Sequence, residues 1–449
     1  MARGAIGDSG EVQRLIKTLP RRGFRFVGAV REEHGTMAVV PVDLPRPTDT
    51  LPDKPSVAVL PFDNLSGDPK KDYFSDGITE DIITELSRFS ELLVIARNST
   101  FQYKGKFPDI RQVNRELGVR SVLEGSIRRS GDHVRITAQL IDATTTAHRW
   151  AERYDRELED MFTVQDEVAR TIATILAVRV NKAESEHTLL RPPAAWQAYD
   201  YYLQATDVFA SFLSVGDVTE LYKVRDLLKQ SLTVDSKYAR SYCLLSWVHI
   251  VLWITPLNSD YLRDEVREEA HQLARKAAQL DPNLPLAHAQ FARVLAHKGE
   301  SDSAMAAMSR AIQLNPNFND YRFAAVLIQA GHAARAIKML EANKRLDPFY
   351  PATLPGWLGF AYYMDGQYPD ALLALRECVS RAPSFRFGHM WLAATYARLG
   401  EEARTEAAQC LEIDPILTIR MLRRLLLFKN PQDAEYFFED HSKAGFPKH

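Results

Sequence analysis

A proline that recurs at nearly constant spacing in the second half of the chain constrains the fold more than any other feature. The steps between successive copies, at Pro282, Pro316, Pro348, Pro383 and Pro415, are 34, 32, 35 and 32 residues. A proline lacks an N–H and clashes with the preceding helical turn, so it ends a helix wherever it recurs. The spacing therefore predicts stacked helical hairpins. The copies read Leu280-Asp281-Pro282, Leu314-Asn315-Pro316, Leu346-Asp347-Pro348 and Ile413-Asp414-Pro415, with Arg381-Ala382-Pro383 as a looser copy.

Small residues lie between these prolines, where two helices must approach closely. One repeat has Ala304 and Ala311, and another has Leu358-Gly359, Tyr362 and Ala371. These residues resemble the tetratricopeptide pattern of Leu-Gly-x2-Tyr, then Ala, then Pro. The resemblance implies an all-α solenoid over 190–430 that offers a surface to protein or peptide partners.

A stack of hairpins buries its core only against neighbours, so its last member needs a cap. Apolar residues at helical spacing between Leu417 and Leu427 predict that capping helix. A basic amphipathic helix lying on a membrane is the alternative for the same segment. We expect 431–449 to be a tail.

Residues 56–182 follow a different pattern, which predicts a sheet covered by helices. Short apolar runs at 56–62 and 92–96 and two longer strands joined at Ser130-Gly131-Asp132 predict the sheet. Apolar residues three and four apart predict helices at 76–86, 109–117 and 162–180, which gives an α/β (α+β) sandwich.

This segment also resembles the TolB-N-terminal-like domain that precedes tetratricopeptide arrays in bacterial proteins. The resemblance rests on Val57 to Phe62, Phe74 to Gly77, Leu123 to Ser126 and the stretch from Trp150 to Asp155. It implies a fold but no reaction.

The sequence shows no motif that predicts a catalytic, metal or cofactor site. Asp76, Glu80, Asp81 and Glu85 could place carboxylates on one helix face, although acidic residues in a first turn also favour the helix dipole. No phosphate-binding loop, dinucleotide fingerprint or nucleophile elbow occurs. We therefore expect no cofactor, no metal and no enzymatic activity, including that of the nucleotide cyclases to which such layouts are sometimes fused.

Two short β-type runs flank a Pro-Arg-Arg-Gly turn between Val12 and Gly28. They resemble the C-terminal hairpin, or wing, of OmpR/PhoB-type winged-helix DNA-binding domains, and Arg3 to Asp8 resembles the end of the recognition helix. The resemblance implies a remnant of that domain at 1–35, because its opening sheet and first helices would precede Met1. The remaining cations could hold DNA phosphates without reading sequence. They are Lys17, Arg21, Arg22 and Arg25.

Composition agrees with a multidomain globular protein. The chain has 449 residues, 46% apolar residues and a net charge of −2, so any nucleic-acid site must be a local patch. The three cysteines lie in helical patterns and predict buried apolar positions rather than disulfides.

No apolar segment predicts a secretion signal or a membrane span, so we expect a cytoplasmic protein without a membrane partner. A proline-rich linker is predicted at 36–55.

These features favour a regulator of transcription that joins a truncated DNA-binding module to a partner-binding array. The alternatives are a scaffold or adaptor without a DNA role, and an accessory subunit of an enzyme. The first helix of each repeat should line the concave side of the array, where arginines suit acidic peptides. The predicted groove residues are His288, Gln290, Arg293, His389 and Arg398.

Overall fold

The computed structural model describes residues 16–19, 23–26, 54–176, 192–318 and 320–449 of the chain. It divides into two compact units, Met1–Thr48 and Asp49–His449. In the first unit, β1 (Ile16–Leu19) pairs antiparallel with β2 (Gly23–Phe26), which confirms the predicted hairpin.

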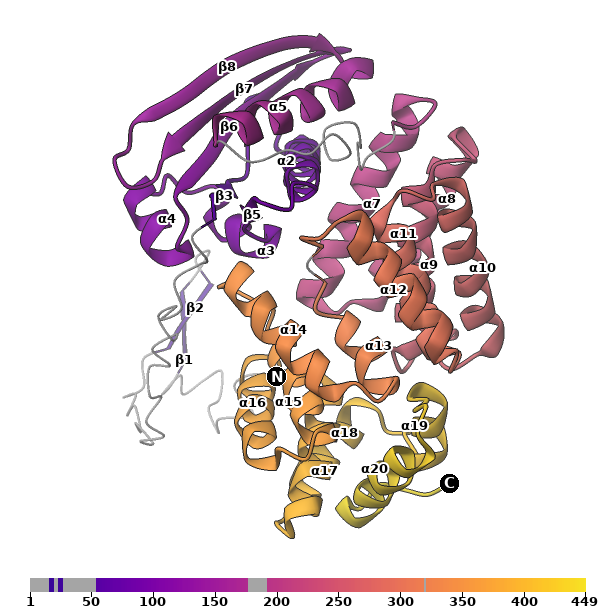
Figure 1. Ribbon diagram of the computed structural model, residues 1–449. Helices are drawn as coiled ribbons and strands as arrows, with labels where there is room; N and C mark the ends of the chain where they lie inside the picture. The colour runs from indigo at the N-terminus through magenta and orange to yellow at the C-terminus, as the bar shows by residue number, and fades with distance from the viewer. Residues whose placement is uncertain (1–15, 20–22, 27–53, 177–191, 319) are drawn as a thin grey trace. The chain divides into compact units, whose positions relative to one another are not determined.

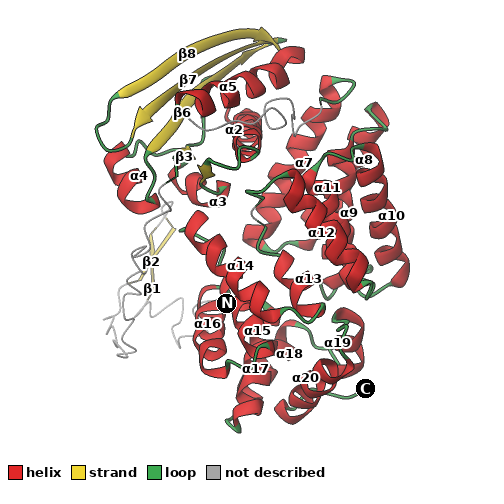
Figure 2. Ribbon diagram, in the orientation of Figure 1, coloured by secondary structure: helices red, strands yellow, loops and turns green. Residues whose placement is uncertain are grey.

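The second unit begins with a five-strand path in the order β5-β3-β6-β7-β8. Parallel pairs join β3 to β5 and to β6, and antiparallel pairs join β6, β7 and β8, so the sheet is mixed. Two helices, α2 and α5, cover one face of this sheet (Figure 2). The elements are β3 (Ser56–Val59), β4 (Asp63–Asn64), α2 (Asp72–Ser87), β5 (Leu93–Val94), α3 (Arg97–Thr100), α4 (Ile110–Leu117), β6 (Ser121–Ser130), β7 (His133–Asp142), β8 (His148–Glu157) and α5 (Met161–Ile175).

The helices α2, α4 and α5 and the strands β3, β5, β6 and β7 confirm the sequence pattern, but β8 was not predicted. Only Tyr154 is buried along β8, and most of its other side chains are exposed. The strand lies at the edge of the sheet, where charged residues protect against pairing with other chains. Its sequence therefore lacks the apolar alternation by which strands are recognised.

An array of antiparallel helices follows the sheet domain (Figure 1). Its fold class confirms the predicted helical repeats. Each helix before a recurrent proline has the Asp, Asn or Ala of the motif as its C-cap residue. The helices are α7 (Trp196–Val215), α8 (Val218–Val234), α9 (Ala239–Ile254), α10 (Asp264–Leu280), α11 (Pro285–His297), α12 (Ser301–Leu314), α13 (Phe323–Gln329), α14 (Ala333–Leu346), α15 (Leu354–Met364), α16 (Tyr368–Arg381), α17 (Arg386–Leu399), α18 (Arg404–Ile413), α19 (Ile419–Leu425) and α20 (Pro431–Ala444).

The Asp or Asn of the motif has a structural role. The side chains of Asp281 and Asn315 accept hydrogen bonds from backbone N–H groups two residues later, at 3.2 Å and 3.0 Å. Such a side-chain turn orients the chain out of one hairpin and into the next. We call the segments 235–240, 281–284, 315–317 and 347–349 the inter-repeat turns.

The end of the array differs from the expected tail. Residues 431–444 form α20, which packs against α17 and buries Phe437 and Phe438. The Asn430 side chain accepts from the Gln432 N–H at 3.0 Å, and Pro431 occupies the first turn. These are ordinary signals of a helix start, so the sequence did carry the information.

Replacing Ala304 or Ala311 by leucine is expected to destabilise the array, because both side chains are fully buried on α12. Adding methylene groups to a packed core typically costs about 1–3 kcal/mol. Urea denaturation followed by circular dichroism measures the change, with Ser309→Leu on the exposed side of α12 as the control. Equal midpoints for all three variants would show that the assignment of the packing face is wrong.

Candidate functional site

The two parts of the second unit share one hydrophobic core. Side chains of the sheet domain, such as Val59 and Ile82, belong to the same buried cluster as Leu203, Val224 and Leu245 of the array. Gly77 of α2 permits this contact, because a Cβ at that position would lie 2.3 Å from Leu203 Cδ2. The first helices of the array thus pack directly on the sheet domain.

A buried ion pair crosses the junction. Arg240, in the first turn of α9, contacts Asp81 of α2 with an N–O distance of 2.7 Å, and Asp81 is fully buried. Asp81 also accepts hydrogen bonds from Gln165 at 3.2 Å and from the Tyr199 hydroxyl. Glu85 of the same helix forms an ion pair with Arg88 at 2.7 Å. Both buried carboxylates of α2 therefore have structural partners.

The inter-repeat turn at 315–317 binds the loop after α2. The side-chain amide of Asn317 lies within hydrogen-bond distance of the carbonyls of Ser87, Phe89 and Leu92, at 2.9, 2.9 and 3.0 Å. Asn315 donates to the Ser87 hydroxyl at 2.7 Å. This turn thus supplies donors to carbonyl groups of the segment between α2 and β5.

The turn at 347–349 binds the segment that leads into α3. Asp347 accepts from the hydroxyl of Ser99, and the Phe349 N–H donates to that same hydroxyl at 2.8 Å. The Ala96 N–H donates to the Leu346 carbonyl at 2.8 Å, and the Phe349 ring packs edge-on to Tyr103. Three inter-repeat turns therefore hold the sheet domain along one edge of the array.

The predicted groove residues are not left free by the packing, contrary to our expectation. Gln290, Arg293 and His389 are buried, with 1%, 8% and 6% of their surface exposed. His288 contacts the Pro282 carbonyl through Nε2 at 2.9 Å, and His389 makes the equivalent contact with Pro383 at 3.0 Å. Each histidine lies six residues after a motif proline, so its ring contacts the carbonyl group of that proline and stabilises the turn.

The fifth predicted groove residue, Arg398, is bound by the chain's own C-terminal helix, α20. Arg398 donates through Nε to Asp440 of α20 at 2.5 Å and through a terminal nitrogen to the Tyr436 carbonyl at 3.3 Å. Tyr363 of α15 donates to the same carboxylate at 2.6 Å. Helix α20 therefore packs on α15 and α17, a contact between distant segments that repeat spacing does not reveal.

His389 makes the stability of the last repeat dependent on pH. The hydrogen bond that His389 Nδ1–H donates to the Glu406 carboxylate, at 2.6 Å, raises the pKa of His389 above 6.5 and outweighs the effect of burial. The protonated ring stabilises the fold fully below the unfolded pKa, and this contribution is lost as pH rises through the folded pKa. The melting temperature of the Glu406→Gln variant should fall most below the wild type under about pH 6.5. A difference that grows toward alkaline pH would contradict this assignment.

A cluster of arginine side chains lies on the first helices of the middle repeats. The guanidinium carbons of Arg293 and Arg322 lie 4.8 Å and 3.7 Å from the centroid of the Trp247 ring. Arg322 forms an ion pair with Asp320 at 2.6 Å, and its side chain keeps 24% of its surface exposed. We call these four residues, with Gln290, the Arg293 cluster.

Charge in the Arg293 cluster is not balanced by its own residues. Two arginines face one carboxylate, and the Nε of Arg293 has no hydrogen-bond partner among the described residues. Burial, and next the charge of Arg322, lower the pKa of Arg293 to about 9. An added carboxylate would relieve this excess of positive charge.

The structure places only part of the predicted DNA site. Lys17 and Arg25 are cross-strand partners in the β1–β2 hairpin, while Arg21 and Arg22 lie outside the described residues. Over the described parts of the chain, no set of three or more His, Cys, Asp or Glu residues could hold a metal ion. None of the helices described is both long and apolar enough to cross a membrane.

One known family matches the sheet domain. Residues 53–171 match the family described as HilA/YgeH-like transcriptional regulator, second domain. The chain therefore contains a transcriptional-regulator-like domain followed by helical repeats. The match does not single out the TolB-N-terminal-like family to which we compared this segment.

Two curated relatives match parts of the chain. "Putative adenylate cyclase 3" of Rhizobium meliloti (strain 1021) is 46% identical over 258 residues, which cover 58% of this chain and 43% of that protein. "TPR repeat-containing protein YpiA" of Bacillus subtilis (strain 168) is 25% identical over 156 residues, covering 34% of this chain and 36% of that protein. The chain thus spans less than half the length of either relative.

The first relative contradicts the expectation that the protein is not an enzyme, because a protein with 46% identity over this range is named a nucleotide cyclase.

Two solved structures are similar to parts of the chain. The TPR protein YrrB, described as having an unusual peptide-binding site, is 16% identical with a TM-score of 0.29. The match covers 42% of this chain and 93% of YrrB. TolB from Acinetobacter baumannii is 17% identical with a TM-score of 0.23 and covers 29% of this chain and 30% of its own.

Proposed function

We propose that this protein is a cytoplasmic regulator of transcription whose helical array binds an acidic segment of a partner protein at the Arg293 cluster. The observation that carries the proposal is the excess of positive charge at Arg293 and Arg322 around Trp247. Arginine offers planar, multi-donor recognition of carboxylates, and its stacking on an indole ring fixes the guanidinium plane. The match of residues 53–171 to a transcriptional-regulator domain supports the regulatory part.

Two variants of one ion pair test this proposal. A labelled peptide of alternating Glu and Leu residues is titrated against the full chain by fluorescence anisotropy. Arg322→Gln should weaken binding about tenfold, because a hydrogen bond to a charged group is lost. Asp320→Asn should strengthen binding, because it removes the one carboxylate of the cluster.

Both variants break the same ion pair, so a purely structural effect would move both affinities in the same direction. Arg310→Gln, on the exposed face of α12, is the matched control and should leave the affinity unchanged. Equal affinities for wild type and Arg322→Gln would sink the proposal.

The N-terminal hairpin is proposed to contact DNA phosphates, in keeping with its resemblance to the wing of OmpR/PhoB-type domains. The pairing of β1 with β2 supports this by placing Lys17 opposite Arg25. Arg21 and Arg22 would add two further positive charges to this segment of the sequence. Binding to duplex DNA should be weak, independent of sequence and steeply reduced by salt. Sequence-selective binding that persists at physiological salt would contradict this part.

The likeness to a protein named a cyclase favours a second candidate function, the formation of cyclic AMP from ATP. Incubation of the full chain with ATP and Mg²⁺, followed by chromatography, measures the product directly. Product above that of a heat-denatured sample would support this candidate, and its absence at high enzyme concentration would remove it.

A further inference from the structure

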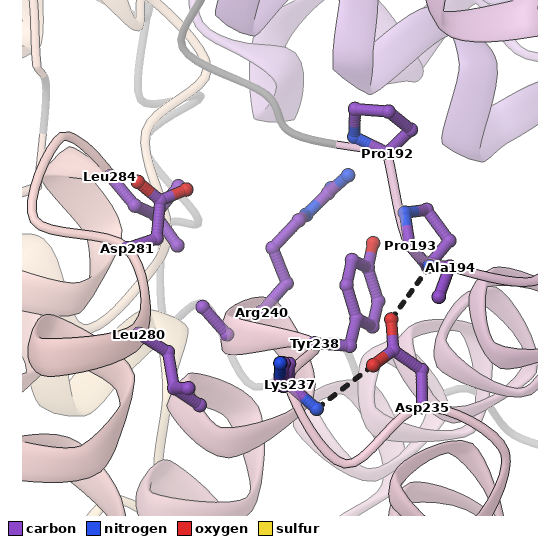
Figure 3. Close-up of a pocket in the computed structure, with 11 residues that line it drawn as sticks. Pro192, Pro193, Ala194, Asp235, Lys237, Tyr238, Arg240, Leu280, Asp281 and Leu284 are labelled. Carbon is purple, nitrogen blue, oxygen red and sulfur yellow. Dashed lines mark hydrogen bonds between the residues drawn. The ribbon is translucent and has the colours of Figure 1, made fainter.

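The outer edge of β8 presents backbone N–H and C=O groups that pair with no other described strand. β8 ends the path β5-β3-β6-β7-β8, and β7 is its only neighbour in the described sheet (Figure 2). In the array, side chains engage such backbone groups, as Asp235 does by accepting from the N–H groups of Ala194 at 2.7 Å and Lys237 at 2.9 Å (Figure 3). Along an edge strand, such groups are a template for pairing with another chain.

The pairing with β7 determines which backbone groups of β8 point outward. The Leu158 N–H donates to the Asp132 carbonyl at 2.9 Å, and in an antiparallel ladder every second residue bonds to the neighbouring strand. The even-numbered residues of β8 therefore bond to β7. The Asp155 carbonyl accepts from the Arg156 side chain at 3.0 Å, as expected of a carbonyl that lies outside the ladder. The residues whose backbone groups point outward are Ala151, Arg153, Asp155 and Glu157.

The charges of β8 are complementary to those of a second β8 in one antiparallel register. Two identical strands related by a two-fold axis form hydrogen bonds only where outward-pointing residues oppose one another. One such register places Tyr154 opposite the same residue of the second copy. Arg153 then faces Asp155, and Glu152 faces Arg156. The two-fold axis makes each of these opposite-charge pairs occur twice.

The neighbouring registers bring like charges together. Pairing centred on Arg153 places two arginines opposite each other, and pairing centred on Asp155 or Glu152 does the same with two carboxylates. Opposite charges across two strands stabilise a sheet, whereas like charges directly opposite destabilise it. The charges that protect β8 from other chains therefore favour one pairing with a copy of itself.

Glu152 and Arg156 are exposed side chains whose charges are not yet paired. Glu152 accepts a hydrogen bond from the Tyr154 hydroxyl at 3.1 Å and Arg156 donates to a backbone carbonyl, but neither forms an ion pair with a described residue. Asp155, by contrast, already contacts two arginines, at 2.6 Å and 3.2 Å. The pairs between Glu152 and Arg156 are therefore the new ionic contacts that a second copy would supply.

We propose that two copies of this chain pair through β8, in the antiparallel register centred on Tyr154, and so join two sheets into one. The outward-pointing backbone groups supply the hydrogen bonds, and the charged pairs select the register. The Asp155 carbonyl exchanges its bond to Arg156 for one from the Arg153 N–H of the second copy. A single pair of short strands buries little surface, so the dimer is weak. This surface is separate from the Arg293 cluster, so either proposal can fail alone.

Charge reversals in two separate chains test the proposal. Sedimentation equilibrium of the full chain, up to about 100 µM, measures the dissociation constant of the dimer. Glu152→Arg and Arg156→Glu each turn both symmetry-related pairs into like-charge pairs, so each should weaken the dimer at least about tenfold. An equimolar mixture of the two variants should dimerise as the wild type does, because each chain supplies the charge that the other lacks.

Recovery in the mixture also excludes misfolding as the cause of the losses in the single variants. Arg111→Glu, which reverses an exposed charge on α4, is the matched control and should dimerise like the wild type. A wild type that stays monomeric at about 100 µM would overturn the proposal. Single variants with unaltered dimerisation, or a mixture that stays monomeric, would overturn it as well.

Discussion

Replacing Arg240 by methionine is expected to lower the free energy of unfolding by about 3–5 kcal/mol, because the change strands a buried carboxylate. Asp81 is fully buried, and Arg240 supplies its only cationic contact among the described residues at 2.7 Å. Urea denaturation monitored by tryptophan fluorescence measures the loss. Arg310→Met, at an exposed site, should change stability by less than about 0.5 kcal/mol.

A second variant separates the cost of the stranded charge from the loss of packing. In Asp81→Leu/Arg240→Met both charges are replaced by apolar groups, and most of the stability should return. A double variant as unstable as Arg240→Met alone would mean that shape, rather than charge, dominates at this junction.

Replacing Phe437 by alanine should destabilise the array by about 3–5 kcal/mol, because the ring is fully buried. It packs on Phe360 of α15, on Phe428 and on His441, with ring centroids 5.6, 5.2 and 4.2 Å away. Thermal unfolding measures the effect. Phe107→Ala removes a ring that is 95% exposed and serves as the control. A tolerated Phe437→Ala would mean that α20 is only loosely attached.

Periodic features of the sequence predicted the repeated hairpins and most of the sheet domain, because helical spacing and recurrent prolines act locally. Helix α20 was missed although Asn430, Pro431 and Gly445 mark its ends. Strand β8 was missed because an exposed edge strand carries no apolar alternation.

The surroundings of the predicted groove residues could not be predicted, because they depend on contacts between segments that are distant in the sequence. Arg398 meets Asp440 across 42 residues, and Arg240 meets Asp81 across 159. Gln290 and Arg293 have polar side chains on first helices, as predicted, yet neighbouring helices bury them. Whether a polar residue on a helix faces a groove or a neighbour is decided by the curvature of the array, which is a property of the whole stack.

The inter-repeat turns join the array and the sheet domain, so the two parts should unfold as one cooperative unit. Hydrogen exchange of the Asn317→Ala variant tests this cooperativity, because the change lies in the array and removes the donor shared by the carbonyls of Ser87, Phe89 and Leu92. We expect faster amide exchange in β3 and α5 of the sheet domain as well as in α12 and α13. Faster exchange confined to α12 and α13, with β3 and α5 protected as in the wild type, would show that the array and the sheet domain do not unfold as one unit.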